Sequence, residues 1–140
     1  MMAGDLQMTH ASMTKFKVET KIWEIPEKTA NDVFQCKRLF VGLAGIADNF
    51  SAVLEWLWSP VDKRPKIRGV EMLLLNDKGY IYHATNLYNW LKLKEKHFAI
   101  GSGMQYAIAA MDSGKSPYEA VKLAAKHDVY TGMGYNKLVL

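Results

Sequence analysis

The sequence has almost none of the residues that build covalent or metal cross-links. Cys36 is its only cysteine, so the chain can form no internal disulfide and no thiolate metal site. The histidines lie far apart and show no paired ligand spacing; they are His10, His83, His97 and His127. We therefore expect neither a metal nor another cofactor.

Long apolar runs are missing as well. No segment approaches the roughly 20 consecutive apolar residues that cross a bilayer. Met1 to Lys15 lacks the apolar block of a secretory signal. These absences predict a cytoplasmic protein without a membrane partner.

Concentrated charge is scarce too. Lysine and arginine number 18 against 14 acidic residues, which gives a net charge of +4, but the basic residues are scattered. The local cluster at Lys92, Lys94, Lys96 and His97 is joined by no aromatic-basic motif of a nucleic-acid-binding module. A solvated loop explains this cluster better than a phosphate-binding patch does. Nucleic-acid binding is thus a hypothesis that rests on the charge balance alone.

What the sequence does contain is the composition of an ordinary globular protein. It has 49% hydrophobic and 23% charged residues. A length of 140 residues is enough for one domain, residues 1–140, with a substantial core. No internal repeat or low-complexity tract divides the chain.

The stretch from Phe98 to Gly114 shows a clear change of pattern. An apolar run, Phe98 to Ile100, breaks at Gly101-Ser102-Gly103. Four apolar residues then fall on one helix face, namely Met104, Ala107, Ile108 and Met111. The pattern predicts a strand that turns sharply into a helix. Glycines permit such a turn, and Ser102 can present its hydroxyl or amide at the helix N-terminus. Most Gly-Ser-Gly triplets are ordinary turns, so this pattern alone does not indicate a functional site.

Turn and cap residues predict a hairpin and two more helices. Val70 to Leu75 and Tyr80 to Thr85 flank a polar turn. Leu39 to Leu43 is an apolar strand, and the helix expected after it has one apolar stripe, made of Phe50, Val53, Leu54 and Leu57, before Pro60. Pro117 to Lys126 is expected as a helix because Ser116, Pro117 and Glu119 form a capping box with a first-turn proline.

The other segments complete an α+β pattern. Further strands are expected at Met1–Gln7, Glu19–Ile25, Leu87–Leu93 and Tyr135–Leu140, and polar connections at Thr9–Lys17, Glu27–Asp32, Ser59–Arg68 and Asp128–Gly132. Helices on both outer faces of two stacked sheets would bury every amphipathic element. The predicted fold is therefore a four-layer αββα sandwich.

Lys21 is the charged residue that fits this pattern least. Strict alternation along Glu19 to Ile25 places Lys21 on the same face as Trp23 and Ile25. A lysine on the more apolar face of a strand needs a carboxylate partner or a depressed pKa. Alternatively, the face lies at a sheet margin and the amine reaches solvent, which the alternation alone favours.

Four short motifs follow one another along the chain. They are MAGD at Met2–Asp5, LAGIAD at Leu43–Asp48, IGSGMQYA at Ile100–Ala107 and HDVYTG at His127–Gly132. In this order they resemble motifs of the N-terminal nucleophile (Ntn) hydrolases of the proteasome β-subunit and HslV kind. The resemblance lies with that family's first hairpin, its glycine turn before the first helix, its central elbow and its late Asp-x-x-Ser/Thr-Gly turn. It covers nearly the whole chain and implies the αββα fold.

The resemblance also implies roles for particular residues. In that family the nucleophile is the hydroxyl of an N-terminal threonine, whose own amine helps to take up the proton. By resemblance, Lys21 is the buried cation that lowers neighbouring pKa values, and Asp5 is its charge partner. Gly45 offers a backbone amide to the developing oxyanion. The groups that orient the terminal amine and a water are Ser102, Asp128 and Thr131.

The chain departs from the family pattern at its start. Its first two residues are methionines, and nothing matches the strand that would begin with the threonine. Cleavage before Thr9, Ser12 or Thr14 would expose a hydroxyl but remove Asp5. Two hypotheses fit: a strand of about a dozen residues precedes Met1 in the natural protein, or the chain is an inactive member that serves as a structural or assembly subunit. The retained pocket residues favour the first.

The function implied by the resemblance is that of a threonine-type peptidase, acting on peptides or unfolded proteins. It further implies a homo-oligomer and an AAA+ unfoldase as a partner. Ser59 to Arg68 is too short and too rich in proline to hold a second helix that contacts neighbouring subunits in the relatives. We therefore expect a shortened helical layer, and ring assembly stays an open question.

Overall fold

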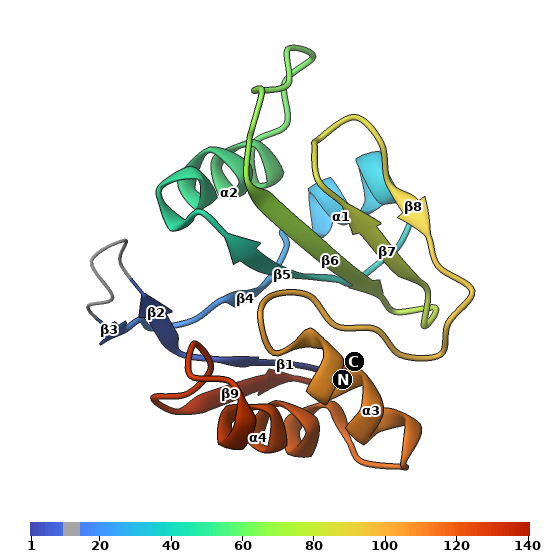
Figure 1. The fold of residues 1–140 in the computed structure, drawn as a ribbon. Helices are drawn as coiled ribbons and strands as arrows, with labels where there is room; N and C mark the ends of the chain where they lie inside the picture. The colour runs from blue at the N-terminus through green and yellow to red at the C-terminus, as the bar shows by residue number, and fades with distance from the viewer. Residues whose placement is uncertain (10–14) are drawn as a thin grey trace.

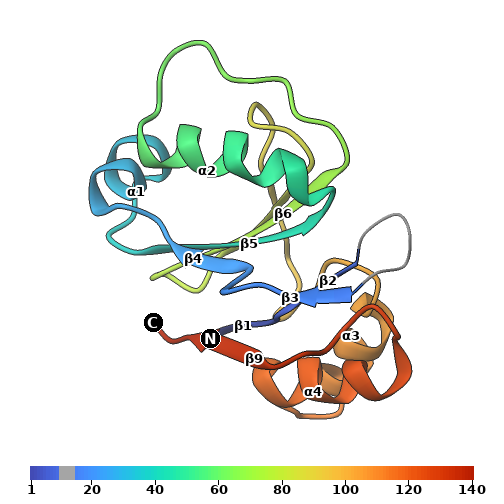
Figure 2. The same ribbon diagram turned by 90° about the vertical axis from the view of Figure 1, so that its left-hand side faces the viewer.

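The protein folds into four layers (Figures 1 and 2). The computed structural model describes residues 1–9 and 15–140, so His10, Ser12 and Thr14 lie outside the described residues. The helices α1 (Glu27–Phe34) and α2 (Phe50–Trp58) cover one face of a five-stranded antiparallel sheet. Its strands, in spatial order, are β4 (Ile22–Glu24), β5 (Leu39–Gly45), β6 (Val70–Asn76), β7 (Ile81–Ala84) and β8 (Leu91–Lys92).

A second, smaller sheet lies against the other face of the first (Figure 2). It pairs β1 (Met2–Asp5) with β9 (Tyr135–Leu138) in antiparallel register, so that Met2 lies opposite Leu138. The helices α3 (Met104–Asp112) and α4 (Pro117–His127) cover this sheet from outside. The arrangement is the predicted α+β sandwich of the αββα type.

Strand β6 shows how the sequence builds two buried faces. Its residues alternate between fully buried and half-buried positions. Met72 and Leu74 pack with Leu57 in the core beneath α1 and α2. Leu73 and Leu75 point the other way and pack with the cluster of Met2, Ile22 and Phe40 between the sheets. Because both faces are covered, the strand is apolar apart from Glu71 and its last residue, Asn76.

Local signals in the sequence are confirmed where side chains cap the backbone. Ser116 Oγ accepts a hydrogen bond from the Glu119 amide, and the Glu119 carboxylate accepts one from the Ser116 amide, so the capping box of α4 is present. In the hairpin between β6 and β7, Asn76 Oδ1 accepts from the amides of Lys78 (3.1 Å) and Tyr80 (2.9 Å). Both features join residues that are close in the sequence, so the sequence alone could predict them.

The segment Glu27–Asp32 was predicted to be a polar loop, and this prediction is wrong. It forms most of α1, which follows Pro26 and buries Thr29 and Ala30. Proline suits a helix start, and the apolar stripe of α1, Ala30, Val33 and Phe34, lies mostly after the polar run that was taken for a loop. Ser59–Arg68 holds no helix, as predicted, and α1 contributes to the same layer instead.

Strand boundaries account for the other differences. The expected connection Thr9–Lys17 includes a hairpin in which β2 (Gln7–Thr9) pairs with β3 (Lys15–Lys17). The strand expected at Leu87–Leu93 is reduced to β8. Phe98 to Ile100 forms no strand, since no backbone group of these three residues pairs with another described residue. Within the described chain, even α4, with 11 residues, falls short of the length and apolarity that a membrane-crossing helix requires.

Candidate active site

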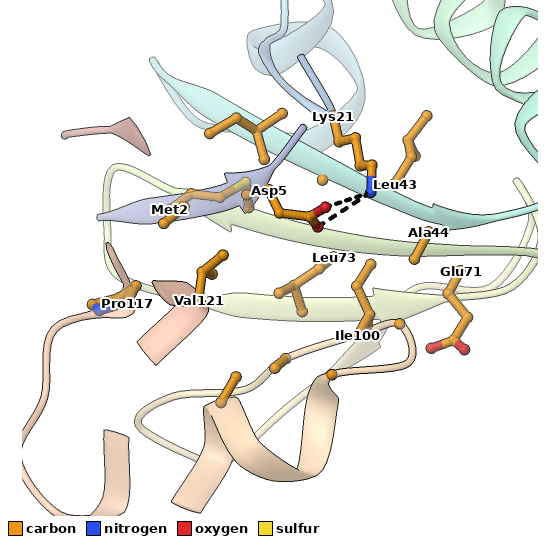
Figure 3. Close-up of a pocket in the computed structure, with 18 of the residues that line it drawn as sticks. Met2, Asp5, Lys21, Leu43, Ala44, Glu71, Leu73, Ile100, Pro117 and Val121 are labelled. Atoms are coloured by element: carbon orange, nitrogen blue, oxygen red, sulfur yellow. Dashed lines mark hydrogen bonds and ion pairs between the residues drawn. The ribbon is translucent and has the colours of Figure 1, made fainter. Parts of the chain in front are cut away.

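A cavity of about 1180 Å³ opens between the two sheets and the helices α3 and α4 (Figure 3). Five of the six residues predicted for the site line it: Asp5, Lys21, Gly45, Ser102 and Thr131. The sixth, Asp128, does not line the cavity itself but accepts hydrogen bonds from two residues that do, Ser102 and Thr131. The structure thus brings together residues from both ends and the middle of the chain.

Asp5 and Lys21 form an ion pair inside this cavity. Lys21 Nζ lies 3.1 Å from each carboxylate oxygen of Asp5, and each side chain is 16% exposed. Asp5 Oδ1 also accepts hydrogen bonds from the amides of Gln7 (2.9 Å) and Gly132 (3.2 Å). A carboxylate with this many donors is well compensated for its burial. Figure 3 shows the two side chains pointing toward each other.

The direction of Lys21 differs from the prediction. Thr20 Oγ1 accepts from the Ile22 amide (3.1 Å) and donates to the Ile22 carbonyl (2.7 Å), so the chain bends just before β4. Strand alternation begins only after this bend. Trp23 and Ile25 therefore pack in the core beneath α1 and α2, whereas Lys21 lies with Ile22 on the side of β1. The predicted face shared by Lys21, Trp23 and Ile25 does not form.

Gly4 lets the two sheets approach each other at this point. A β-carbon on Gly4 would lie 3.2 Å from Ile22 Cγ2 and 4.0 Å from Lys21 Cβ. A larger residue would therefore push β1 away from the chain around Lys21. The ion pair of Asp5 and Lys21 depends on this close approach.

Asp128 accepts hydrogen bonds from two hydroxyl groups. Ser102 Oγ and Thr131 Oγ1 each donate to Asp128 Oδ2 at 2.6 Å, and the Tyr130 amide donates to Oδ1 at 3.2 Å. Burial pushes the pKa of Asp128 up, but these hydrogen bonds and the charge of Lys15 outweigh it and hold the pKa below its ordinary value. An ionised Asp128 fixes both hydroxyl protons, so the remaining lone pairs of Ser102 and Thr131 can accept from a bound amine or water.

Gly101 and Gly103 allow the elbow to meet this acidic turn. Gly101 has φ of +88°, a conformation that favours glycine. A β-carbon on Gly103 would lie 2.9 Å from Thr131 Oγ1 and 3.4 Å from Asp128 Oδ2. The glycines on either side of Ser102 thus allow its backbone to come close to Asp128 and Thr131.

The backbone amide of Gly45 points toward the side on which Lys21 lies. Successive residues of an antiparallel strand direct their N–H groups to opposite sides. Ile46 donates to the Gly69 carbonyl (2.7 Å) on the β6 side. Leu43 donates to the Lys21 carbonyl (3.0 Å) on the opposite side, and Gly45, two residues further along the strand, directs its amide to that side as well. The amide is placed to donate to a group bound in the cavity.

Two residues of the cavity were missed by sequence reasoning. Gln7 is 5% exposed, and its Nε2 donates to the Val129 carbonyl at 2.7 Å. Glu71 faces the cavity from β6 (Figure 3) and lies 3.4 Å from His83 Nε2. Glu71 interrupts the apolar run of β6, and this pattern could have identified it from the sequence. No pattern in the sequence distinguishes Gln7. Among the described residues no three metal-ligating side chains come together.

Comparison with known proteins establishes the fold. No protein-family model and no curated protein matches the sequence. Among solved structures, the chain is similar to Thiobacillus denitrificans BPH in complex with epoxomicin, with a TM-score of 0.69 and 17% identity over 96% of this chain and 88% of that chain. Another structure of Thiobacillus denitrificans BPH gives a TM-score of 0.69 and 16% identity over the same shares. The similarity in fold therefore spans nearly all of both chains.

Proposed function

We propose that this chain is a subunit of a threonine-type peptidase of the proteasome-like Ntn hydrolase family. The observation that carries the proposal is the convergence of Asp5, Lys21, the Gly45 amide and the Asp128 cluster on one cavity. A protein of similar fold has been solved with epoxomicin, a proteasome inhibitor, which supports the same chemistry. The substrate class is peptides or unfolded proteins.

The geometry supports a division of labour among these groups. A threonine hydroxyl at the free end of a strand attacks the peptide carbonyl, and its proton passes by way of the terminal amine to the leaving amine as the C–N bond breaks. The Lys21 ammonium favours the ionised form of that hydroxyl, and the Gly45 amide stabilises the oxyanion. Asp128, with Ser102 and Thr131, holds the amine and later the water that hydrolyses the ester intermediate.

The proposal requires a position for the strand that carries the threonine. Within the described chain β1 pairs only with β9, so its other edge carries unpaired backbone groups. Across the cavity, Phe98 to Ile100 also lack backbone partners among the described residues. Buried backbone groups need hydrogen bonds, and a strand between these two segments would supply them on both sides. We place the nucleophile on such a strand.

A direct test extends the chain. The open reading frame upstream of Met1 supplies the added segment where it encodes a strand beginning with threonine, and a designed strand of alternating apolar residues serves otherwise. We expect the extended protein, freed of its leader, to hydrolyse a fluorogenic peptide amide. The same protein with alanine as its first residue is the matched control and should be inactive. Equal hydrolysis by both proteins would contradict the proposal.

A second candidate is a noncatalytic structural or assembly subunit. The observation in its favour is that Met1, Met2, Ala3 and Gly4 line the cavity without any hydroxyl group. An in-frame stop codon close upstream of Met1 in the genome, together with inactivity of the extended protein, would favour this candidate. An in-frame segment that begins with threonine would favour the peptidase.

Assembly is a separate part of the proposal. We expect a homo-oligomer, with an AAA+ unfoldase as its partner, as in compartment proteases. Sedimentation velocity at micromolar concentration tests it. A monomer under these conditions would overturn the compartment arrangement while leaving the peptidase chemistry to the assay above.

A further inference from the structure

Gln7 is a buried polar residue that joins the two halves of the candidate site. Its backbone amide donates to Asp5 Oδ1 at 2.9 Å, and its side-chain Nε2 donates to the Val129 carbonyl at 2.7 Å. The side chain is part of the cavity wall and is 5% exposed. Hydrogen bonds fix the position of a buried amide side chain, and the same bonds restrain the groups to which it is bound.

The turn of residues 128–132 is attached differently at its two ends. At the Gly132 end, the Gly132 amide donates to Asp5 Oδ1 (3.2 Å), and the Gly132 carbonyl accepts from the Leu6 amide (3.1 Å). At the other end, which begins with Asp128, the Gln7 side chain holds the Val129 carbonyl. The Gln7 side chain thus ties the Val129 side of the turn to the strand segment that follows Asp5.

We propose that Gln7 is a positioning residue that holds the Asp128 end of the turn against the pair of Asp5 and Lys21. The functional meaning of this inference rests on the proposed peptidase activity, but the positioning itself does not. Removing the Gln7 donor breaks the bond between the buried strand segment and the exposed Val129 end of the turn, and water can take its place at the carbonyl. The turn then shifts, and the hydroxyl donors of Asp128 lose their alignment.

The test replaces Gln7 by methionine, which has a similar length and no N–H donor. The matched control is Asn49→Leu, which removes another side-chain amide bond to a loop carbonyl, from Asn49 Nδ2 to Arg68 at 2.7 Å. For Gln7→Met we expect amide hydrogen exchange at Thr131 to rise at least tenfold. We also expect the midpoint of the Asp128 carboxyl titration, followed by carbon-13 NMR, to move upward toward its ordinary value. The control should change neither quantity.

Two results would overturn the inference. One is an unchanged Asp128 midpoint in Gln7→Met; the other is a rise in exchange that is equally large in the β5–β6 ladder, which would indicate general loosening. If Gln7→Met does not fold, Gln7→Leu replaces it, because leucine also lacks an N–H donor and adds no charge near Asp128. The same two readouts then decide.

Activity provides a readout that separates this inference from the proposed function. In the extended protein that begins with threonine, Gln7→Met should lower kcat about tenfold and leave KM within about twofold, as expected for lost alignment of groups that act in the transition state. An extended protein without any activity, combined with the NMR changes, would support the positioning role and contradict the peptidase.

Discussion

The Lys21 ammonium lies 3.1 Å from both carboxylate oxygens of Asp5, and the two residues lie in or next to strands of different sheets. Asp5 ends β1, whereas Lys21 directly precedes β4. The ion pair therefore connects the two stacked sheets within the cavity. Its removal should affect both the stability of the sandwich and the chemistry proposed for it.

A double-mutant cycle with Asp5→Asn and Lys21→Met measures this connection. Each single change leaves a partner without its counter-charge in a largely buried place, so we expect each to lower the free energy of unfolding by about 1–3 kcal/mol. The coupling energy should exceed about 1 kcal/mol in urea unfolding. The control pair is Arg38 and Glu24, whose side chains are each 43% exposed, and solvent screening should make its coupling clearly weaker. Equal coupling in both cycles would contradict the prediction.

Gly45 should tolerate no side chain. Its φ is +107°, and a β-carbon there would overlap the carbonyl oxygen of Gly69. We expect Gly45→Ala to cost about 3 kcal/mol or more, because strain and a backbone clash add up. Gly79→Ala is the control: its φ of +77° is also positive, but nothing lies within 4 Å, so the cost should stay near 1–2 kcal/mol. Thermal unfolding of both variants distinguishes these values.

The acid stability of the protein should depend on Ser102. Hydrogen bonds keep the folded-state pKa of Asp128 below its ordinary value despite burial. The carboxylate therefore stabilises the fold above its unfolded-state pKa, and this contribution is lost as the pH falls through the folded-state pKa. Ser102→Ala removes one donor, so the pKa should rise and the loss of stability on acidification should become smaller. Urea unfolding between about pH 2 and 6 tests this, because the contribution is lost below the ordinary pKa of an aspartate. A profile identical to that of the unmodified protein would speak against it.

The capping box of α4 provides a prediction that is independent of the site. Ser116→Ala removes the acceptor for the Glu119 amide, and we expect a loss of about 0.5–2 kcal/mol. Ser113→Ala serves as the control, since its hydroxyl only donates back to the Ala109 carbonyl within α3 and should matter by less than about 0.5 kcal/mol. Equal losses of unfolding free energy in the two variants would contradict a stabilising role of the capping box.

The sequence predicted elements whose signals are local. The cap of α4, the turn at Asn76 and the apolar stripe of α2 each lie within a few residues of the structure they specify. Helix α1 was missed because its larger apolar residues, Val33 and Phe34, come at its end, after the polar run Glu27–Asp32. The β2–β3 hairpin was missed because lysines at positions 15 and 17 read as a polar connection. A strand was expected at Phe98–Ile100 from its apolar residues, but strands need partners, and none faces it within the described chain.

The candidate site was predictable as a set of residues but not in its geometry. Resemblance of short motifs pointed to Asp5, Lys21, Gly45, Ser102, Asp128 and Thr131. The alternation rule misplaced Lys21 because the side chain of Thr20 bends the backbone before β4. Gln7 was beyond reach, since only the tertiary approach of residues 128–132 gives its side chain a partner. Interactions between distant parts of the chain depend on the fold and cannot be read from spacing.

The antiparallel register of β1 and β9 has a practical consequence for handling the protein. Met2 pairs with Leu138, and both Met1 and Leu140 border the cavity. An affinity tag fused to either terminus would emerge beside the cavity and act as a tethered competitor for any peptide offered in solution. Ligand titrations should therefore use tag-free material.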